Sequence, residues 1–194
     1  MVTGKDVQKI KKKLAKAQDG KRFEHTISVS YTAAALAMRY RLPVAEAYLA
    51  GLLHDCAKCL PDKKLLQICE KNGLGVSETE RRNPYLLHGR AGAYLAKTEY
   101  DIQDEDILHA ICFHTTGRMA MSELEKIVFI ADYIEPGRKK AKNLEEIRAL
   151  AFESLDLTIV KILENTLAYL NSTSGEIDEM SVKTLEYYRE RTGA

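Results

Sequence analysis

The sequence lacks a long apolar run, an excess of either charge, and a cysteine framework, and each absence narrows what it can encode. No apolar stretch in the 194 residues approaches the ~20 that a membrane span requires. The basic segment 9–14 is not followed by the apolar region of a signal peptide. We therefore expect a cytoplasmic protein with no membrane partner.

Charge is almost balanced, with 29 Lys and Arg residues against 28 Asp and Glu residues. Proteins whose main task is to bind nucleic acid carry a basic excess, so we expect no nucleic-acid partner. The balance does not exclude a small phosphorylated ligand, because such a ligand requires only a few local cations.

Four cysteines in a chain of this length do not predict a disulfide framework. Cys56 and Cys59 have the CxxC spacing of zinc and redox sites. A zinc site would require a second such pair, and a thioredoxin-type motif would require a βαβ context. Neither is present, so we interpret the cysteines as small, buried apolar side chains.

Helical periodicity occurs in nearly every segment and strand-like alternation in few, which predicts an all-α fold. The 45% hydrophobic content suits a single domain over 1–194, with a core at about 20–140 and C-terminal helices at about 143–191 packed on it. Caps, prolines and glycines predict helices at 6–17, 23–40, 44–57, 63–71, 104–114, 124–134 and 143–171. Two more are expected, one that begins at residue 84 and a last one that ends near residue 191. The polar stretch 73–83 is the best loop candidate.

The segment 51–58 organises the candidate site, because it leads an apolar helix directly into His54 and Asp55, with Lys58 three residues later. Neighbouring helical residues project about 100° apart, so this pair can share one metal ion only at the end of the helix. Other helices would then supply the remaining ligands. The available donors are His25, His88, His114 and Asp132.

Each candidate also has an ordinary structural interpretation. Asp132 lies in an apolar helix, where a buried carboxylate must either pair with a cation such as Arg or bind a metal. His88 and His114 can be core histidines with satisfied hydrogen bonds. Lys58 and Arg138 can be solvated surface cations.

The order of His25, His54-Asp55 and Asp132 resembles that of the HD-domain metal-dependent phosphohydrolases. The sequence is most similar to their YqeK-type bacterial branch, the symmetrical diadenosine tetraphosphate hydrolases. The segments that carry this similarity are 52–58, 88–89, 113–117 and 131–138. The similarity covers about residues 20–190.

This resemblance implies an all-α HD-domain helical bundle with a metal site between its helices. It implies cleavage of dinucleoside tetraphosphates into two nucleoside diphosphates, with His25, His54, Asp55 and Asp132 as metal ligands. This nitrogen and oxygen set suits iron, which we expect, or manganese or zinc. The ion would activate water and polarise the phosphoryl group. The residues expected in catalysis are Asp55, Lys58, His88 and His114, and those expected to contact phosphate are Lys58, His88, His114, Thr115, Thr116, Gly117 and Arg138.

Other functions remain open at this point. An HD-type nucleotidase or phosphatase acting on nucleoside monophosphates would use much the same residues. An HD-GYP phosphodiesterase is less favoured because the sequence has no Gly-Tyr-Pro segment. A non-catalytic nucleotide-binding regulator would be expected to lack ligands, and all four are present. The number of ions, the preferred purine base and the presence of a homodimer are not decided by the sequence.

Overall fold

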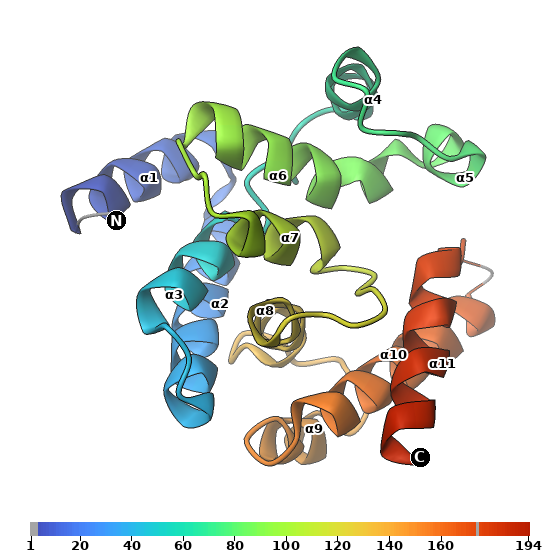
Figure 1. Cartoon of the computed structure of the whole chain (residues 1–194). Coiled ribbons are helices and arrows are strands. Elements are labelled where there is room, and N and C mark those ends of the chain that lie inside the picture. The colour runs from blue at the N-terminus through green and yellow to red at the C-terminus, as the bar shows by residue number, and fades with distance from the viewer. Residues whose placement is uncertain (1–3, 174) are drawn as a thin grey trace.

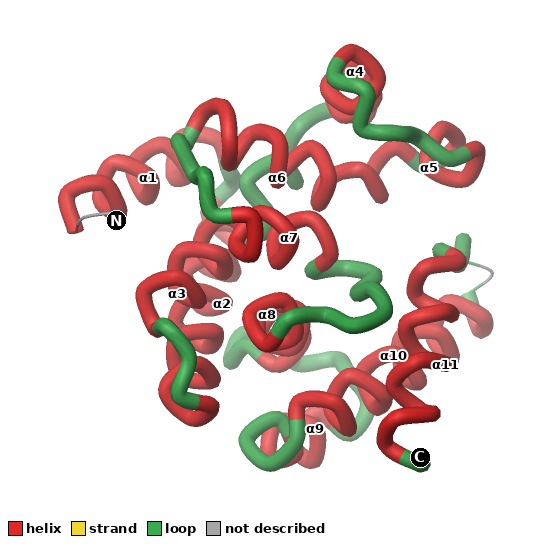
Figure 2. Tube along the Cα trace, in the orientation of Figure 1, coloured by secondary structure: helices red, strands yellow, loops and turns green. Residues whose placement is uncertain are grey.

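The computed structural model describes residues 4–173 and 175–194, and within these ranges the regular secondary structure is all helical, with loops between the helices (Figures 1 and 2). The elements are α1 (Gly4–Ala17), α2 (Gly20–Tyr40), α3 (Val44–Leu53), α4 (Asp62–Lys71), α5 (Glu78–Arg82), the 3₁₀ helix η1 (Pro84–Leu87), α6 (His88–Glu99), α7 (Glu105–Phe113), α8 (Glu123–Ile134), α9 (Leu144–Leu150), α10 (Leu155–Ser172) and α11 (Glu179–Thr192). The all-α prediction is confirmed. Among the described helices, none is both long and apolar enough to cross a bilayer.

Helix α8 lies at the centre of the bundle, in contact with α2, α3, α7, α9 and α10 (Figure 1). Ser122 begins it with a capping box, as the sequence predicts. Every residue from Leu124 to Ala131 is buried, because this part of the helix has neighbours on all sides. In the last turn of α8, Ile134 remains in the core while Asp132 is only partly buried.

Helices α2 and α3 pack closely because Gly51 faces α2. A Cβ atom at Gly51 would lie 2.9 Å from the Cα of Ser30 and 3.2 Å from the Cβ of Ala33. Small residues on both helices therefore permit the approach. It places the end of α3 against the early turns of α2, where the ring centroids of His54 and His25 are 5.3 Å apart.

A second close approach joins α6 to α7. A Cβ atom at Gly89 would lie only 2.5 Å from the carbonyl oxygen of Cys112, so no larger residue fits without a shift of one helix. This contact lies beside His88 on α6 and His114 after α7. Their ring centroids are 5.0 Å apart.

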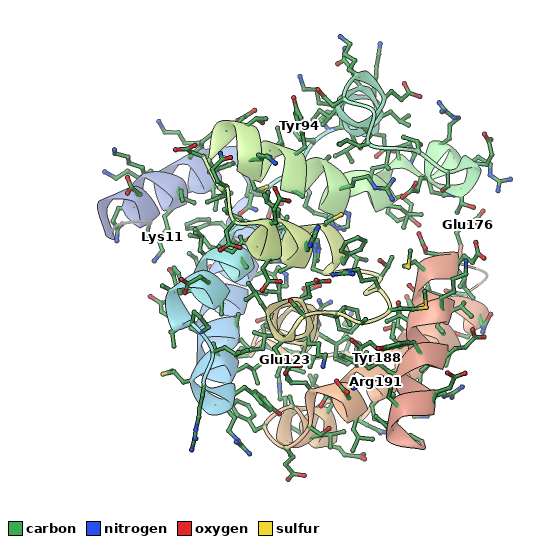
Figure 3. The ribbon with its side chains drawn as sticks, viewed as in Figure 1. Lys11, Tyr94, Glu123, Glu176, Tyr188 and Arg191 are labelled. Carbon is green, nitrogen blue, oxygen red and sulfur yellow. The ribbon has the colours of Figure 1, made fainter. Side chains whose placement is uncertain are left out.

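Helix α11 packs on α10 and holds the loop between α7 and α8. The hydroxyl of Tyr188, which is 1% exposed, accepts the Met121 N–H at 3.0 Å. Figure 3 shows Tyr188 on the side of α11 that faces α8. The Cγ2 of Thr184 lies 2.8 Å from where a Cβ at Gly117 would be, and Gly117 has a φ of +63° that favours glycine. The loop that carries Thr115 is thus supported by α11.

The structure differs from the predicted secondary structure in three segments. The helix predicted at 44–57 ends at Leu53, and residues 54–59 form successive turns. The helix predicted at 143–171 is two helices, because Ser154 caps α10 by accepting the Leu157 N–H. The predicted loop 73–83 contains α5, which begins with a capping box between Ser77 and Glu80.

The interpretation of the cysteines holds only in part. All four are free, and Cys56 and Cys69 are buried as expected. Cys112 is half-buried and Cys59 is exposed. Cys59 lies in the turns after α3, where the chain has already left the core.

Candidate metal centre

Four imidazoles and two carboxylates meet where several helices end. His25 lies in the second turn of α2, His54 and Asp55 directly follow α3, and Asp132 lies in the last turn of α8. His88 begins α6 and His114 follows α7. The rings form a row in the order His25, His54, His114 and His88, with successive centroids 5.3, 5.0 and 5.0 Å apart. All six candidate donors are brought together.

Three of these imidazoles are anchored in the same way. The Nδ1 atoms of His54, His88 and His114 each lie 2.7 Å from a backbone carbonyl oxygen three residues earlier. These oxygens belong to Gly51, Tyr85 and Ile111. A carbonyl only accepts hydrogen bonds, so each Nδ1 carries a proton, and each Nε2 faces the cluster with a lone pair when the ring is neutral. Neutral imidazoles bind metals in this form.

His25 is anchored by a side chain, because within α2 the preceding carbonyls accept helical N–H groups. Its Nδ1 lies 3.3 Å from Oε1 of Glu135, and its Nε2 lies 3.0 Å from Oδ1 of Asp132. Glu135 is buried and also accepts the Gly137 N–H at 2.5 Å. Sequence reasoning assigned Glu135 no role, although it lies three residues after Asp132.

The two oxygens of Asp55 face different parts of the cluster. Oδ2 is 3.4 Å from Nε2 of His54 and 3.9 Å from Nε2 of His25. Oδ1 is 3.5 Å from Nε2 of both His88 and His114. Within the described residues, three overlapping groups have ligand atoms within 4.8 Å of one another, and they are His25–His54–Asp55, His54–His114–Asp132 and Asp55–His88–His114. Asp55 is therefore shared between two sides of the centre.

These residues fit a transition-metal ion. Nε2 of His25, Nε2 of His54 and Oδ1 of Asp55 are buried and form no hydrogen bond with any described residue. Buried polar atoms without a partner are costly unless something binds them. The donors are imidazole nitrogens and carboxylate oxygens, a mixed set that suits iron, manganese or zinc.

The imidazoles keep the carboxylates ionised. Burial alone would raise the pKa of Asp55, but the nearby imidazoles of His54 and His114 favour its charged form and hold the pKa well below its usual range. Burial likewise opposes ionisation of Asp132. The nearby imidazoles of His25 and His54 outweigh this effect and lower its pKa. Both groups can therefore present anionic oxygens at neutral pH.

His88 has the opposite environment. Burial lowers the pKa of His88 to about 3, and the charges of His114 and Lys58 act in the same direction. The ring is therefore neutral at physiological pH. The ammonium of Lys58 lies 3.3 Å from its Nε2 and can donate a hydrogen bond to it.

Some of the remaining predicted residues contact the metal centre, and others do not. Thr115 Oγ1 lies 3.2 Å from Nε2 of His114, and Arg138 Nη2 lies 3.1 Å from Oδ1 of Asp132. Thr116 has no contact with the cluster, and its hydroxyl donates to the Gly117 carbonyl. The Gly117 N–H donates to the Phe113 carbonyl at 2.8 Å.

Arg22 belongs to the site but was missed by sequence reasoning. Its Nη1 lies 2.6 Å from Oδ2 of Asp55, which is only 4% exposed. Arg22 precedes His25 by three residues, so both side chains lie on the same face of α2. That spacing was the available signal.

The chain is similar to known proteins over most of its length. The HD domain family matches residues 22–137. The chain is 41% identical to a protein from Halalkalibacterium halodurans named "Bis(5'-nucleosyl)-tetraphosphatase, symmetrical", over 88% of each chain. It is 36% identical to a protein of the same name from Staphylococcus aureus, over 94% of each chain. A crystal structure of a "predicted HD superfamily hydrolase involved in NAD metabolism" from Clostridium acetobutylicum matches with a TM-score of 0.92 and 42% identity, over 95% of this chain and 97% of that one.

Proposed function

The chain belongs to the HD domain family, and we propose that it is a metal-dependent symmetrical bis(5′-nucleosyl)-tetraphosphatase that converts diadenosine tetraphosphate into two molecules of ADP. The main support for a metal-dependent hydrolase is the set of buried metal-ligand atoms on His25, His54 and Asp55 that have no hydrogen-bond partner. The choice of substrate rests on the relatives of that name, which match over 88% and 94% of the chain.

His25, His54, Asp55 and Asp132 would hold the ion, with iron expected and manganese or zinc as alternatives. When bound, such an ion acts as a Lewis acid toward a phosphate oxygen and lowers the pKa of a water molecule. Asp55 contributes an anionic oxygen that is nearly inaccessible to solvent, at 4% exposure, so bulk water does not compete strongly for it.

His88 and His114 lie on the other side of Asp55. The neutral His88 presents its Nε2 lone pair and accepts a hydrogen bond from a water molecule beside the scissile phosphate. His114 and the Thr115 hydroxyl, 3.2 Å apart, contact the phosphate oxygens. His88 and His114 with Asp55 form a donor group of their own, so binding of a second ion is the alternative role of these two imidazoles.

Cations neutralise the charge of the phosphates, which is most of what phosphoryl transfer requires of a protein. Lys58 supplies a point charge next to His88. Arg138 lies at the opposite side, against Asp132, and its planar guanidinium can hold two phosphate oxygens at once. Its partner Asp132 keeps it oriented toward the centre.

Chromatography of the products from diadenosine tetraphosphate, alongside elemental analysis of the purified protein, tests this proposal. ADP as the only nucleotide product, with stoichiometric metal, supports it. A mixture of ATP and AMP contradicts symmetrical cleavage. Rapid hydrolysis of nucleoside monophosphates without tetraphosphate cleavage would identify a nucleotidase, and binding without any hydrolysis would identify a regulator. Light scattering would decide separately whether the chain forms a homodimer.

A further inference from the structure

A groove of about 650 Å³ lies beside the metal centre, where the first turns of α2 meet the segment that follows α8. Its walls carry Lys21, Arg22, His25, Arg138, Lys139 and Lys140, and we refer to it as the basic groove. Sequence reasoning singled out only Arg138 and His25 among these residues. The pair Lys21-Arg22 is brought close to the pair Lys139-Lys140 only when α2 and α8 pack together.

The basic groove has a local excess of positive charge, although the charge of the whole chain is almost balanced. It has five Lys and Arg side chains in a protein with 29 such residues against 28 acidic ones. Its two carboxylates are already engaged, since Asp19 caps α2 by accepting the Arg22 N–H and Glu135 accepts the Gly137 N–H. A cleft lined by one sign of charge focuses the field and attracts anions.

The three lysines have no structural partner. Lys21, Lys139 and Lys140 are all exposed, and none forms an ion pair or a side-chain hydrogen bond with any residue that the structure describes. Like charges placed together without a partner disfavour the folded state slightly. Their arrangement is therefore better explained by a ligand than by stability.

The two arginines connect the basic groove to the metal centre. Arg22 donates to Oδ2 of Asp55 at 2.6 Å, and Arg138 donates to Oδ1 of Asp132 at 3.1 Å. His25 both lines the groove and lies 3.0 Å from Asp132. An anion in the groove would thus contact side chains that also contact the cluster.

The opposite end of the row of imidazoles has a different character. There Thr115 contacts His88 and His114, and it also lines a second cavity of about 260 Å³. Lys58 lies next to His88 at this end, and the cations that line the cavity, Arg90 and Lys183, are paired with Glu80 and Glu179. The metal centre therefore lies between two places where a substrate can extend, and the one beside His25 carries most of the charge.

We propose that the basic groove binds the phosphates of one nucleoside diphosphate half of the substrate, beyond the phosphorus that is hydrolysed. The inference rests on the proposed function and deepens it, because a tetraphosphate extends in both directions from its central bridge. The charge of the groove favours oligophosphate, and its lining includes no Phe, Tyr or Trp among the described residues. The other half lies toward Lys58 and Thr115.

The test replaces the three unpartnered lysines together, as Lys21→Gln, Lys139→Gln and Lys140→Gln. Exposed ion pairs are weak individually, so we expect the three changes to raise KM for diadenosine tetraphosphate about 10-fold, with a much smaller effect on kcat. Calorimetric titration with ADP should show a similar loss of affinity. The loss should shrink at high salt, because screening already weakens these contacts in the unmodified protein.

The matched control is Lys63→Gln, Lys64→Gln and Lys71→Gln, three exposed lysines on α4, which packs on α6 and η1. It makes the same change in net charge elsewhere and should leave KM and ADP affinity unchanged. Equal affinities in the groove variant and the unmodified protein would overturn the inference, as would equal losses in both variants. Failure of the proposed function would be visible separately, as an absence of ADP among the products of the unmodified protein.

Discussion

Glu135 is the one side chain that sets the tautomer of a metal-facing imidazole, because His54, His88 and His114 use backbone carbonyls instead. Its carboxylate accepts from both His25 Nδ1 and the Gly137 N–H. A carboxamide has one acceptor oxygen, so Glu135→Gln leaves one of these donors facing an NH₂ group. We expect Glu135→Gln to weaken metal binding about 10-fold and Glu135→Ala by up to about 100-fold.

Competition with a chromophoric chelator measures this affinity without reference to activity. The exposed Glu190→Gln on α11 has the same change of charge and should bind metal normally. Normal binding by both Glu135 variants would mean that Glu135 does not orient His25.

The cysteines differ in reactivity because only a thiolate is a good nucleophile. Burial raises the pKa of Cys56 to about 12 and that of Cys112 to about 11, and it also raises the pKa of Cys69. Cys59 is exposed. Iodoacetamide at mildly alkaline pH should therefore modify the native protein once, at Cys59, as peptide mass spectrometry would show.

Cys59→Ser is the control, and it should remain unmodified until the protein is unfolded. Fast labelling of Cys56 in the native state would show that the turns after α3 open readily.

At the scale of helices, two glycines determine how closely the elements that carry the ligands approach. Gly89→Ala would place a Cβ 2.5 Å from a backbone oxygen of α7, and backbone cannot move aside as a flexible side chain can. We expect a loss of about 1–3 kcal/mol in the free energy of unfolding, despite the better helix propensity of Ala. Metal affinity should fall as well, because His88 would move away from His114.

Thermal unfolding and chelator competition measure both effects. Gly20→Ala is the matched control, because a Cβ there has nothing within 4 Å and this change should be neutral or slightly stabilising. A stable Gly89→Ala with unchanged metal affinity would show that α6 and α7 can separate without cost.

Most helices could be predicted from the sequence because caps, prolines and apolar spacing act locally. The end of α3 could not, because residues after Leu53 turn toward the site, where His54 donates to the Gly51 carbonyl. The candidate ligands were recognisable from their order along the chain. Arg22 and Glu135 were not, because their partners Asp55 and His25 are 33 and 110 residues away in sequence.

At the scale of the whole molecule, metal binding and folding are linked through protons. Burial lowers the pKa of His25 and of His114, but the neighbouring carboxylates of Asp132, Glu135 and Asp55 outweigh it, so both pKa values are raised without metal. Raised values stabilise the metal-free fold at low pH, and this contribution is lost as pH rises through them. A metal must displace the same protons, so its affinity rises with pH.

The Tm difference between metal-loaded and metal-free protein should therefore widen as pH increases from about 6 to about 8. Differential scanning fluorimetry with and without a chelator measures it. Asp55→Ala, which lacks the shared carboxylate, should show no such difference at any pH. If the Tm difference of the unmodified protein did not change with pH, metal binding would not be linked to the protonation of His25 and His114.

The hydrogen bond from Met121 to Tyr188 also determines the order in which parts of the site can form during synthesis. During synthesis, His25 through Arg138 are made first, and Tyr188 follows 50 positions after Arg138. At about 5–20 residues per second, translation needs roughly 3–10 s to cover that distance. In this interval the nascent chain already contains every candidate ligand, while the loop that carries Thr115 still awaits the helix that holds it. The candidate ligands can therefore come together before α11 fixes the loop that carries Thr115.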